Sequence, residues 1–259
     1  MMATLYTNLK PQMKSKNRSE VQKPSPPNKK NQHIIKPNIT IHKWIKHTEQ
    51  NNGDKREKTK NSISQVKIRS LNVNGLGQQG KREKALKKLS SKNDDFIILV
   101  DTRLRGESLK NTRKIWTGNI HISTNNRPNS SGGILILAKK GLDIIPKESG
   151  TDRDNMGRMA WEIYEIRGHK LLIMGIYGPP GGDDTQNATF FKEEVFEVLD
   201  NETYDNVIMA GDWNVFLDTE KDHKNYKNPA KYRAKTREEI KSKMRTHNLS
   251  DIYREQNQT

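Results

Sequence analysis

The chain has 259 residues, enough for one substantial domain with an extension. It contains no cysteine, which excludes disulfide bridges and thiolate metal sites, and its longest apolar runs, such as 96–100, are far too short to span a bilayer. The formal net charge of +16 favours a polyanionic partner, most often nucleic acid, over a membrane. The N-terminus lacks the apolar stretch of a secretory signal, so we expect an intracellular protein.

Residues 1–64 differ in composition from the rest of the chain. They carry 14 Lys and Arg against 4 Asp and Glu, and the stretch 23–32 has too few large apolar side chains to offset the entropy of ordering it. We therefore predict a disordered basic arm over 1–64, with one apolar patch around Ile41, Trp44 and Ile45. The arm suits the phosphates of DNA or RNA, and a purely solubilising role is the alternative.

A folded domain is predicted over 65–259, because short apolar runs recur there. Those at 66–73, 95–101, 132–138, 158–166, 170–177 and 206–212 indicate strands, several of them buried on both faces. Helices are expected over 81–89, over 190–199, and from Thr236, which opens a capping-box pattern with Glu239. Arg167 and Gly168 mark a hairpin turn. Hairpins mixed with buried strands and helices imply a layered α/β or α+β domain.

The glycines Gly75, Gly77 and Gly80 follow the first of these strands and match a dinucleotide-binding fingerprint. That fold requires strands and helices in strict parallel alternation, whereas this chain continues into a hairpin. Asn72 and Asn74 also occupy a stretch that is usually apolar in a dinucleotide-binding strand. We therefore expect the glycines to shape a loop rather than to bind a cofactor.

Polar side chains stand where the predicted strands end. They are Asn72, Asn74, Asp101, Tyr177, Asp212 and Asn214. Each alone could be an ordinary turn or capping residue, but strand ends at one sheet edge can converge on a single site. Carboxylates and amides are ligands that suit Mg²⁺, together with substrate phosphate. The set predicts metal-assisted phosphodiester hydrolysis.

Four stretches resemble, in order, the motifs of the endonuclease/exonuclease/phosphatase family. They are SLNVNGL (70–76), LVDTRL (99–104), GIYGPP (175–180) and AGDWNVFLD (210–218). The nuclease domain of LINE-type non-LTR retrotransposons is most similar, since 222–235 and 249–255 also resemble that domain. The resemblance implies a four-layer sandwich of two mixed β-sheets flanked by helices. It also implies a nuclear, Mg²⁺-dependent (or Mn²⁺-dependent) enzyme that nicks DNA.

The resemblance also assigns roles to the residues that match its motifs. Asn72 and Asp101 would bind the metal, with Asn72 and Asn74 near the phosphate. Tyr177 would contact the scissile phosphate, Asp212 would orient the attacking water or assist the leaving group, and Asn214 would hydrogen-bond the phosphate. In the basic segment after the last motif, we expect five residues to contact nucleic acid: Lys224, Lys227, Lys231, Arg233 and Lys235.

Two departures from the family pattern qualify this assignment. Asp101 stands where the family usually has glutamate, which is one methylene longer. The family's last strand, with its catalytic histidine, has no counterpart before Thr259, and neither Ser250–Asp251 nor Asp222–His223 replaces it. We therefore expect a C-terminally incomplete domain, and the loss of an acid/base partner lowers rates by about 10²–10⁴-fold. The alternatives are a nucleic-acid-binding remnant without catalysis, and a phosphatase or lipid phosphodiesterase of the same fold.

Overall fold

Two mixed β-sheets form the centre of the structure, a computed structural model that describes residues 2–7, 39–45, 64–128, 130–222 and 232–256. The strands are β1 (Met2–Thr7), β2 (Ile39–Ile45), β3 (Ser64–Asn72), β4 (Phe96–Val100), β5 (Ile120–Ser123), β6 (Ile134–Ala138), β7 (Ile145–Thr151), β8 (Met159–Ile166), β9 (His169–Tyr177), β10 (Asn206–Asp212) and β11 (Leu249–Asp251). The helices are α1 (Gln79–Ser90), α2 (Gly106–Ile115), α3 (Asp184–Phe190), the π-helical turn η1 (Phe191–Val195), α4 (Glu197–Asn201), α5 (Thr219–Asp222), α6 (Ala234–Thr246) and α7 (Ile252–Gln256).

The strand order brings segments that are distant in sequence side by side. One sheet has the order β11-β1-β10-β9-β8-β7, and the other has the order β2-β3-β4-β6-β5. Within each sheet one neighbouring pair is parallel, β9 with β10 and β3 with β4, and the other pairs are antiparallel. This topology lacks the repeated parallel strands of a dinucleotide fold. Within each parallel pair the carboxyl ends of both strands lie at the same end of the sheet, β3 with β4 and β9 with β10, where a site can form.

Strand β4 shows why the central strands are apolar along their whole length. Phe96, Ile98 and Val100 point into the core between the two sheets, whereas Ile97 and Leu99 point outward into a second core beneath helices α1 and α2. Side chains alternate between the faces of a strand, so a strand covered on both sides needs an uninterrupted apolar run. The six apolar runs predicted as strands are all strands in the structure.

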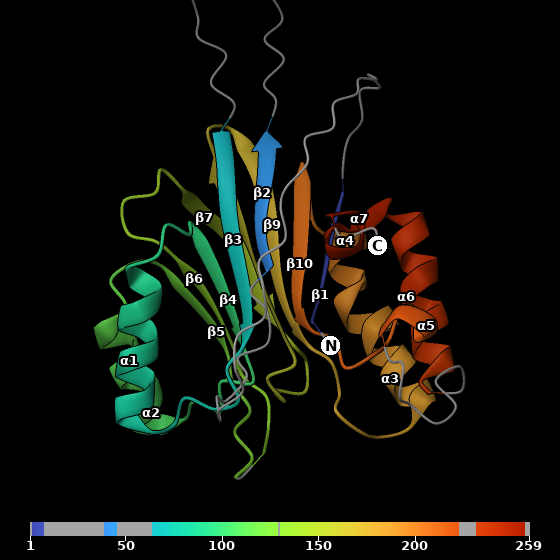
Figure 1. The fold of residues 1–259 in the computed structure, drawn as a ribbon, viewed down its shortest axis with the longest axis horizontal. Coiled ribbons are helices and arrows are strands. Elements are labelled where there is room, and N and C mark those ends of the chain that lie inside the picture. Colours follow the sequence, from blue (N-terminus) through green and yellow to red (C-terminus); the bar gives the residue numbers. More distant parts are fainter. Residues whose placement is uncertain (1, 8–38, 46–63, 129, 223–231, 257–259) are drawn as a thin grey trace, which may run out of the picture.

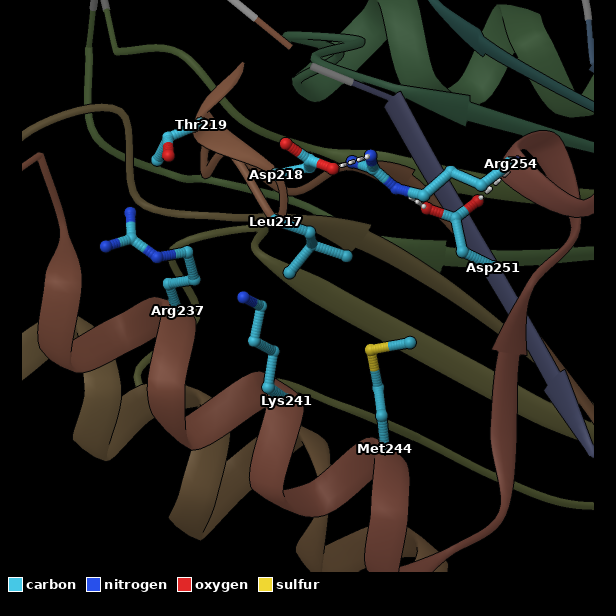
Figure 2. A pocket seen from close by; sticks show the side chains of 8 residues that line it. All are labelled: Leu217, Asp218, Thr219, Arg237, Lys241, Met244, Asp251 and Arg254. Carbon is cyan, nitrogen blue, oxygen red and sulfur yellow. Dashed lines mark hydrogen bonds and ion pairs between the residues drawn. The ribbon is translucent and has the colours of Figure 1, made fainter. Parts of the chain in front are cut away.

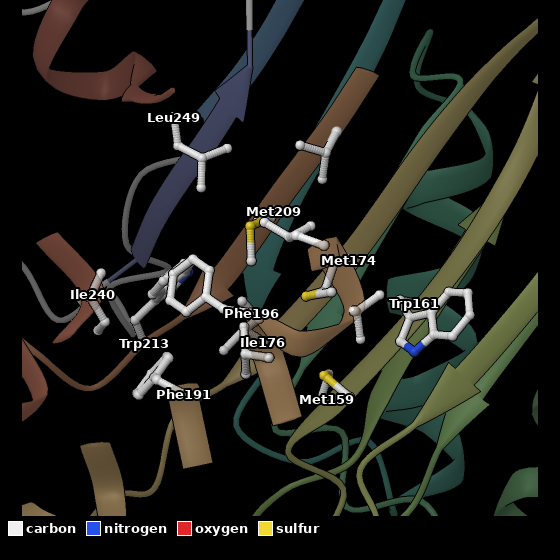
Figure 3. Packing of buried hydrophobic residues seen from close by; sticks show 14 of the residues in the cluster. Met159, Trp161, Met174, Ile176, Phe191, Phe196, Met209, Trp213, Ile240 and Leu249 are labelled. Carbon is white, nitrogen blue, oxygen red and sulfur yellow. The ribbon is translucent and has the colours of Figure 1, made fainter. Parts of the chain in front are cut away.

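Helices cover the outer face of each sheet, which completes four layers (Figure 1). Helices α1 and α2 pack on the sheet that contains β3 and β4, and α3, η1, α4 and α6 pack on the other sheet (Figures 1 and 3). The predicted sandwich of two mixed sheets flanked by helices is therefore confirmed. None of the helices in the described part of the chain has the length and apolar content that a membrane-spanning segment requires.

The N-terminal region departs from the prediction of a disordered arm over 1–64. Strand β1 lies between β10 and β11, and β2 pairs with β3. A strand added beside an existing one satisfies main-chain N–H and C=O groups, so it needs less apolar content than an independent core would. As a result neither β3 nor β10 is an edge strand. Residues 8–38 and 46–63 lie outside the described residues.

Helix α6 begins differently from the predicted capping box at Thr236. Its N-cap residue is Arg233, with φ of 49°, and Thr236 is already helical. The hydroxyl of Thr236 donates to the Asp184 carboxylate at 2.6 Å, and the same carboxylate accepts the main-chain N–H groups of Lys235 and Thr236. The first N–H groups of a helix have no partner within the helix. In α6 a carboxylate of α3 accepts them, and the capping-box sequence at 236–239 gives no sign of that distant partner.

Candidate active site

Three of the predicted site residues are the last residues of their strands. Asn72 ends β3, Tyr177 ends β9 and Asp212 ends β10. The Nδ2 of Asn72 donates to Oδ2 of Asp212 at 2.8 Å. This hydrogen bond connects two residues 140 positions apart and joins the carboxyl ends of strands that belong to different sheets. The structure therefore brings these residues together at one end of the sandwich.

Asp101 directly follows β4 and is only 3% exposed. Its Oδ1 accepts hydrogen bonds from Nε of Arg103 at 3.0 Å and from the main-chain N–H of Gly132 at 2.9 Å, and its Oδ2 accepts one from Nη2 of Arg103 at 2.7 Å. The guanidinium thus binds the carboxylate through two parallel hydrogen bonds, the strongest form of this ion pair. Asp101 and Arg103 have φ of 55° and 51°, strained values for residues other than glycine.

The loop after β3 is tied to the loop after β4. The main-chain N–H of Asn74 donates to Oδ1 of Asn72 at 3.0 Å, and Oδ1 of Asn74 accepts from Nη2 of Arg103 at 2.8 Å. Gly75 adopts a φ of 82° and donates its N–H to the Asp101 carbonyl at 2.7 Å. In this structure Gly75 shapes the loop, as expected, and the Asn74 amide is held by Arg103.

Tyr177 lies against these groups and is 7% exposed. Burial raises the pKa of its hydroxyl above the usual value, and the carboxylates of Asp101 and Asp212 raise the pKa further; a hydrogen bond with Ser131 and the charge of Arg103 act in the opposite direction. The phenol therefore stays protonated at neutral pH. It is available as a neutral hydrogen-bond donor beside two carboxylates.

The segment after β10 is anchored by an aromatic stack. Trp213 is fully buried and stacks on Phe191, with ring centroids 5.5 Å apart and an angle of 16° between the rings (Figure 3). Asn214 donates its main-chain N–H to Oδ1 of Asp212 at 3.3 Å and its Nδ2 to the Gly178 carbonyl at 2.6 Å. The buried ring therefore fixes the positions of the polar residues before and after it.

Sequence reasoning missed Arg103 and Trp213. A basic residue two positions after the strand-end aspartate could have indicated Arg103, because that spacing allows a local carboxylate pair. The single large apolar side chain between Asp212 and Asn214 could have indicated an anchor in the core.

The arrangement of side chains around Asp101 does not fit a divalent cation, because Asp101 is paired with Arg103 and has no further acidic ligands clustered beside it among the described residues. Within the described residues, no three His, Cys, Asp or Glu side chains cluster as metal ligands would. A pair of unit charges about 4 Å apart interacts by about 4 kcal/mol at an effective dielectric constant of about 20. A dication bound beside the guanidinium of Arg103 would thus meet a repulsion of roughly twice that size. A divalent cation at Asp101 would compete with Arg103 for the carboxylate, and Mg²⁺ stays a prediction.

The histidines with described side chains make contacts elsewhere. His121 contacts the Gly150 carbonyl, and His169 and His247 lie near Asp205 and Asp200. Asp251, discussed above as part of a Ser–Asp pair, binds Arg254 at 2.9 Å instead. None of these side chains replaces the histidine that the resemblance leads us to expect.

The predicted nucleic-acid contacts after β10 are only partly described. Arg233 is buried and donates to the carbonyls of Pro179 and Gly181, so the prediction that it contacts nucleic acid is wrong: its charge holds two main-chain segments together. Lys235 is exposed and its Nζ lies 2.8 Å from Oγ1 of Thr185. Lys224, Lys227 and Lys231 lie outside the described residues.

Another basic surface lies on the two helices next to the site. We call it the basic helical face; its members are the exposed side chains of Lys81, Lys84, Lys87, Lys88 and Lys92 on and just after α1, and of Lys110, Arg113 and Lys114 on α2. Glu83 and Glu107 are the acidic residues of these two helices. Lys81 donates to the carbonyls of Val73 and Asn74 at 2.9 and 3.0 Å, which connects this face to the site.

A pocket of about 440 Å³ lies away from this site, between α6, the segment after β10, and β11 (Figure 2). Its polar wall contains Arg254, whose guanidinium binds the carboxylates of Asp251 at 2.9 Å and Asp222 at 2.6 Å and lies 3.7 Å from Asp218. These ion pairs hold the C-terminal segment on the domain. The pocket adds nothing to the strand-end site.

Comparison with known proteins supports the fold. No protein family model matches the chain. AP endonuclease LMAP from Leishmania major has 19% sequence identity and a TM-score of 0.56, with 73% of this chain and 69% of that chain covered. The APE2 catalytic domain from Xenopus laevis has 18% identity and a TM-score of 0.51, with 68% and 66% covered. D. rerio TDP2, complexed with single-strand DNA product, has 20% identity but a TM-score of only 0.43, with 58% and 61% covered.

These identities show a shared fold and no more. The chain spans about two thirds of the length of the solved structures that it matches. The chain therefore has the architecture of the AP endonuclease and APE2 structures. Its activity, substrate and partners have to be argued from its own residues.

Proposed function

We propose that this chain is a DNA endonuclease domain of the retrotransposon type, which binds DNA and hydrolyses a phosphodiester bond at the joined ends of β3, β9 and β10. The observation that carries the proposal is the hydrogen bond from Asn72 to Asp212, because it assembles one polar site from two sheets. The shared fold with an AP endonuclease supports the same reaction class. The basic helical face supports a polyanionic substrate.

The reaction needs a base for water and donors for the phosphate. Asp212 is held by Asn72 and by the main chain of Asn214, so its carboxylate is positioned to accept a proton from an attacking water. The protonated hydroxyl of Tyr177 supplies a donor for the phosphate oxygens, where charge develops during hydrolysis. Mg²⁺ or Mn²⁺ is the cofactor that the resemblance implies; because Arg103 binds the Asp101 carboxylate, the roles of Asp212 and Tyr177 are assigned without it.

One observation favours a second function, DNA binding without catalysis. The carboxylate of Asp101 is already held by Arg103, and Nδ2 of Asn214 already donates to a main-chain carbonyl. Two groups that the resemblance assigns to metal and phosphate are therefore engaged within the protein. A remnant that binds DNA would retain the basic helical face but would not nick.

The decisive experiment is nicking of supercoiled plasmid by the purified chain, in Mg²⁺, in Mn²⁺ and in EDTA, with Asp212→Asn in parallel. Nicking by the wild-type chain that the variant lacks supports the endonuclease. No nicking by the wild-type chain in any of the three conditions, with retained binding of DNA at low salt, supports the binding function instead. Hydrolysis of a lipid phosphodiester but not of DNA would contradict both.

A further inference from the structure

Arg103 places a cation in the described part of the site, directly above the Asp101 carboxylate. It is 43% exposed, whereas the carboxylate of Asp101 beneath it is 4% exposed. An arginine guanidinium is charged at every accessible pH. A permanent positive charge therefore lies at the surface of the site with its counter-charge buried.

The hydrogen bonds of Arg103 fix the orientation of its guanidinium. Nε and Nη2 bind Asp101, and Nη2 also binds Oδ1 of Asn74, which uses three of the five N–H groups. The two N–H groups of Nη1 make no hydrogen bond to a described residue. The guanidinium is held in place through Nε and Nη2, while Nη1 is open to an anion. Because its orientation is already fixed, it loses little conformational entropy when an anion binds.

The surroundings of Arg103 contain the other groups of the proposed reaction. Hydrogen bonds connect Arg103 to the base of the proposed reaction: Arg103 binds Asn74, the main-chain N–H of Asn74 binds Asn72, and Asn72 binds Asp212. The main chain is strained at both Asp101 and Arg103. Strain of this kind persists where the surrounding structure holds it in place, and such positions concentrate at functional sites.

From this geometry, and resting on the proposed function, we propose that Arg103 is the phosphate-binding cation of this site and that it competes with a divalent metal ion for Asp101. In the arrangement described, Asp101 holds the guanidinium and does not bind a metal, while Nη1 binds a non-bridging oxygen of a phosphodiester. Asp101 is then a positioning residue, and Arg103 contacts the substrate directly.

Binding of inorganic phosphate and of dimethyl phosphate in EDTA, measured by calorimetry, tests the phosphate contact. Arg103→Gln is expected to weaken binding at least tenfold, and Arg245→Gln, an exposed arginine in the last turn of α6, serves as the matched control and is expected to change nothing. Asp101→Asn is expected to bind phosphate at least as tightly as wild type, because it removes the neutralising charge but keeps an acceptor for Arg103. Phosphate binding that survives Arg103→Gln, or that disappears in Asp101→Asn, would overturn the proposal.

Binding of Mn²⁺ alone, followed by electron paramagnetic resonance, tests the competition. Arg103→Gln is expected to bind Mn²⁺ at least tenfold more tightly than wild type, and adding Asp101→Asn is expected to abolish that gain. Tighter Mn²⁺ binding by wild type than by Arg103→Gln would show that Arg103 supports the metal instead of excluding it.

Two controls keep these tests interpretable. Circular dichroism establishes whether each variant is folded. If Arg103→Gln is unfolded, Arg103→Lys is used in its place, because it retains the positive charge but lacks the planar guanidinium. A several-fold loss of phosphate binding is then expected, and no loss contradicts the proposal. Plasmid nicking by wild type and Asp212→Asn reports on the proposed function separately, so either idea can fail while the other stands.

Discussion

The amide of Asn72 controls the position of the Asp212 carboxylate, because one hydrogen bond of 2.8 Å links the two across the sheets. We expect Asn72→Ala to lower the nicking rate by about 10²-fold, the effect typical of losing one preorganised donor. Asn72 is only partly buried, so thermal stability should fall little. Plasmid nicking and thermal melting measure both quantities. Asn93→Ala, at an exposed position before β4, is the control, and equal nicking by both variants would refute the role of Asn72.

The hydroxyl of Tyr177 makes stability depend on pH under alkaline conditions. Its pKa is raised in the folded protein, so above about pH 10 the unfolded chain loses a proton that the folded chain keeps. The free energy of unfolding should therefore be unaffected by this group below about pH 10 and fall above it, by at most about 1.4 kcal/mol per pH unit.

Urea unfolding of Tyr177→Phe at increasing pH tests this effect. The variant should lose less stability than wild type above about pH 10. The free energy of unfolding of the variant should still fall with pH, because burial also raises the pKa of Tyr164 and Tyr204. Parallel curves for wild type and variant would show that the hydroxyl of Tyr177 titrates normally.

Three side chains beside the site act as a unit. Arg103, Asp101 and Asn74 form one hydrogen-bonded unit, so a substitution at one of them changes the other two. Effects of such neighbours are not additive. Variants of this unit are therefore best interpreted in pairs, as in the Arg103 and Asp101 double variant.

At the scale of elements, the π-helical turn η1 and the end of β10 act together. Phe191, the first residue of η1, stacks on Trp213, and Phe196 lies 6.4 Å from the same ring (Figure 3). Because Trp213 stands between Asp212 and Asn214, the helical layer positions the end of β10. The core between these helices and the sheet that contains β10 thus fixes the position of Asp212 and Asn214.

Substitution of Trp213 should separate packing from chemistry. Trp213→Ala is expected to cost about 3–5 kcal/mol of stability through the cavity it leaves, and to reduce nicking even under conditions where the protein is folded. Trp213→Phe should cost far less, because it keeps a ring on Phe191 and removes an indole N–H that has no hydrogen-bond partner among the described residues. Urea unfolding and nicking at low temperature measure both effects. A stable and fully active alanine variant would contradict the anchoring role.

At the scale of the whole molecule, the placement of charge indicates where DNA lies. The basic helical face is continuous with the site through Lys81, and it covers the outer side of the sheet that contains Asn72. Arg233, in contrast, is used inside the fold. DNA should therefore contact α1 and α2.

Charge reversal on α1 tests this placement. Lys84→Glu with Lys88→Glu should weaken DNA binding for all sequences and reduce the slope of log K against log salt by about 2, one for each lost phosphate contact. Lys192→Glu with Arg245→Glu changes the net charge equally at two exposed positions, on η1 and α6, which pack on the other sheet. Fluorescence anisotropy over a salt series measures the slopes. The same slope for both double variants would show a non-specific effect of net charge.

The sequence alone determined the layered fold and the position of its central strands. Runs such as 96–100 and 207–210 are apolar on both faces, the pattern typical of a central strand that is covered on both sides. It also predicted that polar residues at the ends of these runs converge, and the contact between Asn72 and Asp212 agrees with that expectation. The physical reason is local, since strand period and strand ends are visible in neighbouring residues.

Only the tertiary structure decided which partner each polar side chain takes. Arg103 holds Asp101, Asp184 rather than Thr236 caps α6, and β1 and β2 add strands to sheets whose other members lie far along the chain. Hydrogen bonds and ion pairs of this kind depend on distances between residues remote in sequence. Many pairings satisfy the same composition and charge, and packing of the two sheets selects among them.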